Sequence, residues 1–307
     1  MENCLPQEVT LHEVVLRDGI QNEKTIIPTE EKIRLIERLV NCGTKRIEVS
    51  SLVNPRLVPQ MADAEDLWGK IERKEGILYS ALILGEKSLN RAIHCNVPHA
   101  GIFVSASETH SQKNSNRTIS EARREALKLI ERAQSADMKV RAGVMNAFGC
   151  AYEGKIPAEK VMSLVRDFMK TEPDEICLAD TSGMANPKLI KEVLMRLREV
   201  TGNKTISLHL HNTRGLGLAN VWEALRQGVS IFDTSMGGLG GCPFIPGARG
   251  NIATEDTVHM LHEMKIETGI DLNSLIETSL NFERFMGKEL PAIVTHLKGN
   301  SIINIQS

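Results

Sequence analysis

The sequence lacks any apolar stretch long enough to cross a bilayer. No apolar run reaches the roughly 18 residues that a membrane span needs. The start Met1-Glu2-Asn3-Cys4 has neither the basic nor the apolar region of a secretory signal, and no Arg- and Ser-rich leader follows it. The end Asn304–Ser307 differs from a peroxisomal address. We therefore expect a cytoplasmic protein with no membrane partner.

A strong charge of one sign is also missing. The 37 Lys and Arg residues nearly balance 39 Asp and Glu residues, which leaves a net charge of −2. This balance gives no electrostatic reason for binding nucleic acid or an anionic membrane, so a small-molecule partner is expected. The 6 cysteines form no Cys-x-x-Cys pair and no disulfide-like cluster, which favours a reducing compartment. They are Cys4, Cys42, Cys95, Cys150, Cys177 and Cys242.

What the chain does contain is an alternation of short β-branched or apolar runs with longer amphipathic ones, repeated about eight times. The predicted strands are Glu8–Leu16, Arg46–Ser50, Ile77–Leu82, Ala100–Ser105, Lys139–Met145, Glu175–Ala179, Thr205–His211 and Ser230–Thr234. The predicted helices are Thr29–Asn41, Met61–Arg73, Lys87–Cys95, Ser120–Ala136, Pro157–Lys170, Pro187–Val200, Gly215–Gln227 and Thr254–Glu267. The alternation predicts an α/β fold, one (β/α)₈ TIM barrel.

No Pro- or Gly-rich linker divides the chain, so we expect residues 1–307 to form a single domain. An open doubly wound sheet is the competing architecture, but no Gly-x-Gly-x-x-Gly turn follows the first strand. Residues 271–307 carry apolar Leu272, Leu275, Ile276 and Leu280 and predict additional C-terminal helices. The apolar surface of this tail is a candidate contact for a homodimer.

A histidine pair stands near the end of the seventh predicted strand. His209 and His211 are spaced i, i+2, so on a strand they project from one face while Leu208 and Leu210 fill the other. Two imidazoles side by side suit a divalent metal. The alternative is that one or both are hydrogen-bonded core histidines.

In a TIM barrel, active residues stand at the carboxyl ends of the strands. Polar groups lie on or directly after several of the predicted strands: Glu48 within the second strand, and Arg17, Asp18, Gln21, Glu108, His110, Asn146 and Asp180 after others. Each carboxylate alone could equally form a salt bridge or cap a helix, Asp180 above all because Thr181-Ser182 follows it. Glu108 is expected to be structural.

A glycine-rich segment, Met236–Asn251, follows the last predicted strand. Its 16 residues contain six glycines, which predicts a loop able to close over a substrate. Cys242 is a candidate for acid–base chemistry, although a lone cysteine is more often an inert small hydrophobe. Asn251 offers a carbonyl oxygen, a suitable ligand for a hard cation.

Taken together, these motifs closely resemble the 3-hydroxy-3-methylglutaryl-CoA lyase family over nearly the whole chain. The residues that carry the resemblance are Arg17-Asp18-Gly19-Ile20-Gln21-Asn22-Glu23, Ile47-Glu48-Val49-Ser50-Ser51, Ser105-Ala106-Ser107-Glu108, Tyr152-Glu153-Gly154-Lys155, His209-x-His211, Gly240-Gly241-Cys242-Pro243-Phe244, Gly250-Asn251 and Ala253-Thr254-Glu255-Asp256.

The resemblance implies a metal-dependent TIM barrel that cleaves an acyl-CoA thioester, 3-hydroxy-3-methylglutaryl-CoA, to acetyl-CoA and acetoacetate. The implied ligands of Mg²⁺ or Mn²⁺ are Asp18, His209, His211 and Asn251. The implied catalytic residues are Arg17, which steadies an enolate, Cys242, which is the loop acid or base, and Glu48 and Asp180 as polar partners. The implied substrate contacts are Arg17, Gln21, Lys24, Ser51 and Asn114.

The chain also departs from the family pattern. Val15-Leu16 replaces the usual Gly-Pro before Arg-Asp, Ile20 replaces a leucine, and Arg249 replaces a small residue before Gly250-Asn251. An added cation could answer another carboxylate or phosphate, or form a surface pair. A lyase for another branched 3-hydroxyacyl-CoA, such as an isohexenylglutaryl or citramalyl thioester, therefore remains open. So do a condensing synthase of the same superfamily and a barrel that has lost catalysis.

Overall fold

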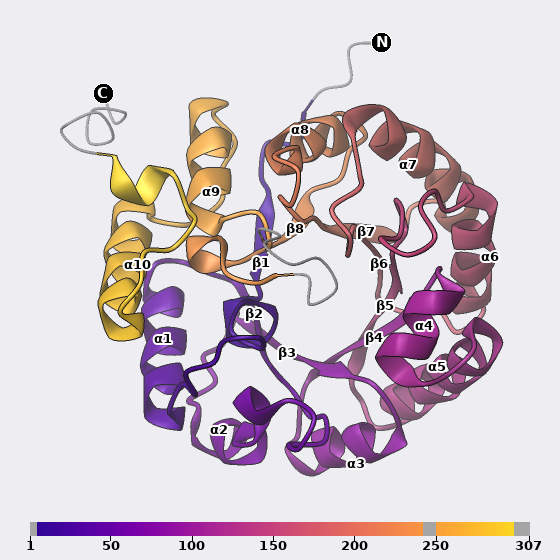
Figure 1. Cartoon of the computed structure of the whole chain (residues 1–307), viewed down its shortest axis with the longest axis horizontal. Coiled ribbons are helices and arrows are strands. Elements are labelled where there is room, and N and C mark those ends of the chain that lie inside the picture. The colour runs from indigo at the N-terminus through magenta and orange to yellow at the C-terminus, as the bar shows by residue number, and fades with distance from the viewer. Residues whose placement is uncertain (1–4, 242–249, 298–307) are drawn as a thin grey trace.

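Eight parallel strands close into a barrel in which β1 pairs with both β2 and β8 (Figure 1). The computed structural model describes residues 5–241 and 250–297. The strands are β1 (Thr10–Glu13), β2 (Arg46–Ser51), β3 (Leu78–Ile83), β4 (His99–Ser105), β5 (Lys139–Met145), β6 (Glu175–Ala179), β7 (Thr205–His209) and β8 (Ile231–Thr234). The predicted TIM barrel is confirmed.

Helices surround the barrel and cover the outer face of its strands (Figure 1). They are α1 (Thr29–Asn41), α2 (Ala64–Lys70), α3 (Glu86–His94), α4 (Glu108–Ser115), α5 (Ile119–Ser135), α6 (Ala158–Met169), α7 (Pro187–Thr201), α8 (Gly217–Arg226), α9 (Thr254–Glu263) and α10 (Leu272–Met286). Short helical turns are η1 (Val15–Gly19), η2 (Pro59–Met61), η3 (Met236–Gly238) and η4 (Val294–His296). Within the described residues, no helix has the length and apolarity that a membrane crossing requires.

Helix α5 shows why the local sequence folds as it does. Thr118 and Glu121 form a capping box, in which the Glu121 N–H donates to Thr118 Oγ1 at 3.2 Å and the Thr118 N–H donates to Glu121 Oε2 at 2.9 Å. Ala126, Leu129, Ile130 and Ala133 then recur at helical spacing and are buried. The cap fixes where the helix begins, and the apolar stripe fixes which side packs on the barrel.

Two strand ends and one helix near the site differ from the predictions. The first strand ends at Glu13 instead of Leu16, because the chain turns into the π-helical η1. The seventh strand ends at His209, and His211 pairs instead with Asn251 in an isolated bridge. The helix α4 was not predicted, since its sequence Glu108–Ser115 has no apolar periodicity to indicate it.

Beyond the barrel, α10 lies against α1 and α9 (Figure 1). Its N-cap is Asp271, whose carboxylate accepts from the Ser274 N–H at 2.6 Å, and Leu275 and Phe282 are buried on its inner side. The predicted C-terminal helices are thus confirmed through His296, whereas residues 298–307 lie outside the described part of the chain. The assignment of the whole chain to a single domain stays a prediction.

The interior of the barrel is unusually polar. Large branched residues normally fill a TIM barrel, but here the buried residues His12, Arg141, Glu175 and Asp233 are linked to one another by hydrogen bonds and ion pairs. The ring of Phe103 lies above Arg141, with its centroid 5.7 Å from the guanidinium carbon. A charged floor therefore lies beneath the end of the barrel where the predicted site residues gather.

Candidate active site

The turn after β1 carries Arg17 and Asp18 to the carboxyl end of the barrel. In η1 the backbone N–H groups of Asp18 and Gly19 both donate to the carbonyl of Val14, at 2.8 and 3.1 Å. Such π-helical turns recur at functional sites because the wider turn redirects side chains. Here it places two consecutive residues, a cation and an anion, on the same side of the chain.

Asp18, His209 and His211 form a buried cluster of potential metal ligands, whose ligand atoms all lie within 4.8 Å of one another. The two histidine Nε2 atoms are 2.9 Å apart, and Asp18 Oδ2 lies 3.7 Å from His211 Nε2 and 4.0 Å from His209 Nε2. Burial alone would raise the pKa of Asp18, but Arg17 and the two imidazoles outweigh it and hold that pKa well below its usual range. Burial lowers the pKa of His211.

This donor set fits a divalent cation. Two imidazole nitrogens and one ionised carboxylate oxygen, converging from β1 and β7, form a mixed N/O set that Mg²⁺ or Mn²⁺ accepts. The two Nε2 atoms face each other at 2.9 Å, so at most one of them can carry a proton there. At least one Nε2 lone pair therefore faces the interior of the cluster, where it could bind a cation. The structure therefore supports the predicted metal cluster for three of its four ligands.

Asn251, the fourth predicted ligand, lies beside Asp18 but presents its amide nitrogen. Its Nδ2 donates to Asp18 Oδ2 at 2.8 Å and to the Leu239 carbonyl at 3.1 Å. Its Oδ1 is buried and has no hydrogen-bond partner among the described residues. A rotation of the amide would turn this unused oxygen toward Asp18, so metal ligation by Asn251 stays a prediction.

Arg17 is clamped between two carboxylates. Its Nε donates to Glu48 Oε2 and its Nη1 donates to Asp18 Oδ1 at 2.5 Å. Burial would lower the pKa of Arg17, but Glu48 and Asp18 together raise it, so the guanidinium is a permanent cation in the pocket. Gln21 Nε2 also donates to Asp18 Oδ1, at 3.0 Å. Glu48 lies at a bulge in β2, a feature that redirects side chains near active sites.

The two ends of the glycine-rich segment meet beside Asp18. Gly240 has φ of +120°, and a Cβ there would lie 2.6 Å from Asn251 Nδ2. A Cβ on Gly250 would lie 2.3 Å from the Gly240 carbonyl carbon. Only glycine fits this close approach. Cys242 and Arg249 lie outside the described residues, so their predicted roles stay predictions.

A cavity of about 380 Å³ opens above this cluster. That volume falls in the usual range for a small-molecule pocket. Seven of the predicted site residues line it: Arg17, Asp18, Gln21, Ser51, Asn114, His209 and His211. Its apolar wall comes from Val53, Leu82, Leu84, Phe103 and Met145. The pocket thus combines a charged end with an apolar side.

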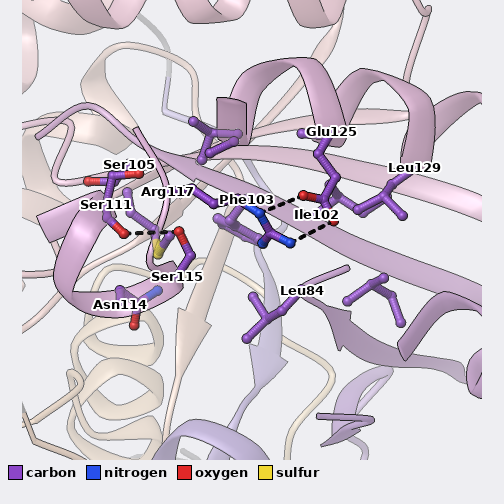
Figure 2. Close-up of a pocket in the computed structure, with 15 residues that line it drawn as sticks. Leu84, Ile102, Phe103, Ser105, Ser111, Asn114, Ser115, Arg117, Glu125 and Leu129 are labelled. Carbon is purple, nitrogen blue, oxygen red and sulfur yellow. Dashed lines mark hydrogen bonds and ion pairs between the residues drawn. The ribbon is translucent and has the colours of Figure 1, made fainter. Parts of the chain in front are cut away.

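A second, much smaller cavity of about 30 Å³ lies between β3, β4 and α5, and Leu84, Phe103 and Asn114 line both. Figure 2 shows Arg117 directed at Glu125 there, with Arg117 Nε 2.7 Å from Glu125 Oε2. Its volume holds about two water molecules. The two cavities therefore adjoin at the three side chains that they share.

Four of the predicted site residues that the structure describes do not line the pocket: Lys24, Glu48, Asp180 and Asn251. The carboxylate of Asp180 is buried and accepts from the N–H groups of Met184 and Ala185, at 2.7 and 3.1 Å, so it caps the turn after β6 as the alternative interpretation allowed. Burial raises the pKa of Asp180 to about 7. Lys24 is exposed. A catalytic role for Asp180 and a substrate contact for Lys24 stay predictions.

Sequence reasoning did not name Asp233 or Phe103 as site residues and named His110 only as a polar residue after the fourth strand, yet all three line the pocket. Burial lowers the pKa of His110 to about 4, so its imidazole is neutral near pH 7. Asp233 belongs to the strand predicted at Ser230–Thr234, and a carboxylate next to Ile231 and Phe232 within a strand was the indication that it has a buried polar partner.

Comparisons with known proteins agree with this geometry. The HMGL-like family matches residues 8–281. The chain belongs to the HMGL-like family. Among its relatives, hydroxymethylglutaryl-CoA lyase YngG of Bacillus subtilis is 42% identical over 94% of this chain and 96% of that protein. The mitochondrial hydroxymethylglutaryl-CoA lyase of Homo sapiens is 41% identical over 89% of this chain and 84% of that protein.

Solved structures of this family have the same fold. The B. subtilis HMG-CoA lyase superposes with a TM-score of 0.92 at 41% identity, covering 95% of this chain and 98% of that one. An HMG-CoA lyase from Acinetobacter baumannii, solved in complex with coenzyme A and 3-methylmalate, gives a TM-score of 0.92 at 39% identity and covers 96% and 97% of the two chains.

Proposed function

We propose that this protein cleaves 3-hydroxy-3-methylglutaryl-CoA to acetyl-CoA and acetoacetate. The observation that carries the proposal is the Asp18, His209 and His211 cluster beside the clamped Arg17 in the pocket at the carboxyl end of the barrel. Membership of a family whose curated relatives are named hydroxymethylglutaryl-CoA lyases supports the same substrate. The acyl-CoA partner is further supported by the coenzyme A in the A. baumannii structure.

The reaction needs no oxidant, reductant or water. The 3-hydroxyl of the substrate loses its proton, and its oxygen forms a carbonyl as the C2–C3 bond breaks. The electron pair of that bond remains on C2, which gives the enolate of the acetyl thioester and releases acetoacetate. A proton added at C2 completes acetyl-CoA.

Mg²⁺ or Mn²⁺ is the proposed cofactor, held by Asp18, His209 and His211, with Asn251 as the predicted fourth ligand. When bound, such a cation supplies Lewis-acid chemistry that makes the 3-hydroxyl easier to deprotonate near neutral pH.

Arg17 is proposed to stabilise the enolate as it forms. A fixed guanidinium held in place before the reaction lowers the cost of developing negative charge, because it need not reorient. Glu48 and Asp18 occupy its Nε and Nη1, so Nη2 is the donor that neither bond uses. The polar groups of Gln21, Ser51 and Asn114 are proposed substrate contacts.

The proton donor at C2 is proposed to be Cys242. This proposal rests on the sequence, where Cys242 follows Gly240-Gly241. Gly241, the residue before the cysteine in the sequence, lines the pocket. A thiol is a suitable proton carrier because its ordinary pKa lies within two units of neutrality.

A cytoplasmic location and a homodimer stay proposals. The cysteines of the described chain, Cys42, Cys95, Cys150 and Cys177, are all free, which agrees with a reducing compartment. A dimer contact through the C-terminal tail is supported by the exposed apolar residues Phe285, Ile293 and Leu297.

The test is cleavage of 3-hydroxy-3-methylglutaryl-CoA by the purified full chain after chelation with EDTA, and again after Mg²⁺ or Mn²⁺ is restored. Equal amounts of acetyl-CoA and acetoacetate, formed only with metal, are expected. Asp18→Asn should abolish this formation, while the matched control Asp66→Asn, on the exposed side of α2, should retain it.

Metal-restored protein that leaves this thioester intact would overturn the substrate assignment. Isohexenylglutaryl-CoA and citramalyl-CoA would then be compared in the same assay. Full cleavage by Asp18→Asn, or full cleavage in EDTA, would overturn the metal-dependent mechanism.

A further inference from the structure

Beneath the metal cluster, a chain of buried polar residues runs down the barrel interior. Arg141 on β5 is 1% exposed, and its Nη2 donates to Asp233 Oδ1 at 2.7 Å while its Nε lies 2.9 Å from Glu175 Oε1. Glu175 also accepts from Arg46 Nη2 at 2.6 Å. Two cations and two carboxylates therefore balance one another at the floor of the barrel.

Asp233 connects this floor to the metal cluster. Its Oδ1 accepts from Arg141, and its Oδ2 lies 3.0 Å from His209 Nδ1. An ionised carboxylate has no proton to give, so His209 Nδ1–H is the donor. The neutral imidazole then carries its lone pair on Nε2, the atom that faces Asp18 and His211.

We propose that Asp233, held by Arg141, is a positioning residue that fixes the ring orientation and tautomer of His209 and thereby sets the affinity of the site for a divalent cation. The proposal rests on the metal site of the proposed function. A carboxylate on the far nitrogen of a ligating histidine orients the ring and makes it a stronger ligand.

The two histidines of the cluster differ in this respect. His211 Nδ1 is buried and has no hydrogen-bond partner among the described residues. His209 is therefore the ligand whose orientation the barrel floor controls. Asp233 is itself 1% exposed and its two oxygens are held by groups on β5 and β7, so it cannot turn away without breaking one of the two contacts.

The chain offers a matched control for this role. Glu175 is also buried, at 4% exposed, and pairs with the same Arg141, but its other partners are Arg46 and Ser207 instead of a predicted metal ligand. Asp233→Asn and Glu175→Gln each remove one charge paired with Arg141. Only the first changes the group on His209 Nδ1.

The experiment measures Mn²⁺ binding to metal-stripped protein without substrate, from the electron paramagnetic resonance signal of free Mn²⁺. Loss of a carboxylate behind a ligating histidine typically weakens metal binding about 10- to 100-fold, and we expect a loss in this range for Asp233→Asn. Glu175→Gln should change the dissociation constant less than about threefold, although the melting temperature should fall for both variants.

A second readout is the ¹⁵N spectrum of histidine-labelled protein, which reports which ring nitrogen carries the proton. In the wild type, His209 should carry its ring proton on Nδ1 and none on Nε2. In Asp233→Asn the proton should be found on Nε2 in some or all molecules, whereas Glu175→Gln should keep the wild-type pattern. If Asp233→Asn fails to fold, the double variant Arg141→Gln/Asp233→Asn, which leaves no unbalanced charge between the pair, replaces it with the same expectation.

Wild-type Mn²⁺ affinity in Asp233→Asn would overturn the proposal, and so would an equal loss in Asp233→Asn and Glu175→Gln, which would indicate a general effect of barrel stability. Both results are independent of catalysis. A wild-type protein that binds Mn²⁺ but does not cleave 3-hydroxy-3-methylglutaryl-CoA would instead overturn the proposed function and leave this proposal standing.

Discussion

Two buried carboxylates hold the turn from which the glycine-rich segment departs, and they make the stability of the protein depend on pH. Glu13 accepts from the Met236 N–H at 2.9 Å, and both oxygens of Glu255 lie 2.9 Å from the Gly237 nitrogen. Burial raises the pKa of Glu13 to about 7 and that of Glu255 to about 8. No cation of the described chain pairs with either of them.

The free energy of unfolding falls as the pH rises, because Glu255 binds its proton more tightly in the folded protein than in the unfolded chain. The pKa of Glu255 is raised from 4.5 in the unfolded chain to about 8 in the fold, so its stabilising contribution is fully present below about pH 4.5 and is lost as the pH rises through 8. At 1.36 kcal/mol for each pKa unit, the free energy of unfolding falls by about 2 kcal/mol between pH 6 and pH 8 through this residue alone.

Glu255→Gln removes this dependence, because the amide stays neutral while its Oε1 still accepts from Gly237. The free energy of unfolding of the variant, relative to the wild type, should rise by about 2 kcal/mol from pH 6 to pH 8. Urea unfolding at both pH values, with EDTA present to remove metal linkage, measures the difference. Glu263→Gln, at an exposed position of the same helix α9, is the control and should track the wild type. If the difference between Glu255→Gln and wild type stays constant with pH, the reasoning is refuted.

Three further predictions concern the pocket. Arg17→Lys keeps a cation but loses the paired donors to Glu48 and Asp18, so kcat should fall about 100-fold while KM changes less; unchanged kcat in steady-state assays would exclude Arg17 from enolate stabilisation. His211→Ala should weaken Mn²⁺ binding by more than about 100-fold, since it removes a direct ligand; calorimetric titration that detects wild-type affinity would count against the cluster. Gly143→Ala should lower the free energy of unfolding by about 1–3 kcal/mol, because its Cβ would lie 2.2 Å from the Phe103 ring; thermal melts measure it, and Phe103→Leu in the same chain should recover part of the loss.

The barrel itself could be predicted because its information is local. Each strand is a short run with apolar residues, and the predicted helices, which do not include α4, are amphipathic, so period and length distinguish them along the chain. The His209 and His211 pair could be predicted for the same reason, since alternate residues of an extended chain share a face; His211 lies just beyond the end of β7, yet its Nε2 still faces that of His209. Leu208 and Leu210, on the other face, are fully buried as that pattern requires.

The roles of the polar residues at the strand ends could not be predicted in this way, because they depend on how the chain turns after each strand. The first strand was predicted to continue to Leu16, and only the fold shows that Val15–Gly19 make a π-helical turn that directs Arg17 and Asp18 into one pocket. Asp180 followed a strand as an active-site carboxylate would, but the turn after β6 uses its oxygens for two backbone N–H groups. One-dimensional spacing cannot distinguish these uses, because both need a polar residue at a strand end.

The sequence by itself determined the fold class, the family and the types of ligand, because these follow from periodicity and from motifs of a few consecutive residues. The tertiary structure decided which side chains act together. Asp233 and Arg141 lie 92 positions apart, yet closure of the barrel brings them within 2.7 Å. Hydrogen bonds and ion pairs act over a few ångströms, so partners on different strands are fixed only when the sheet closes on itself.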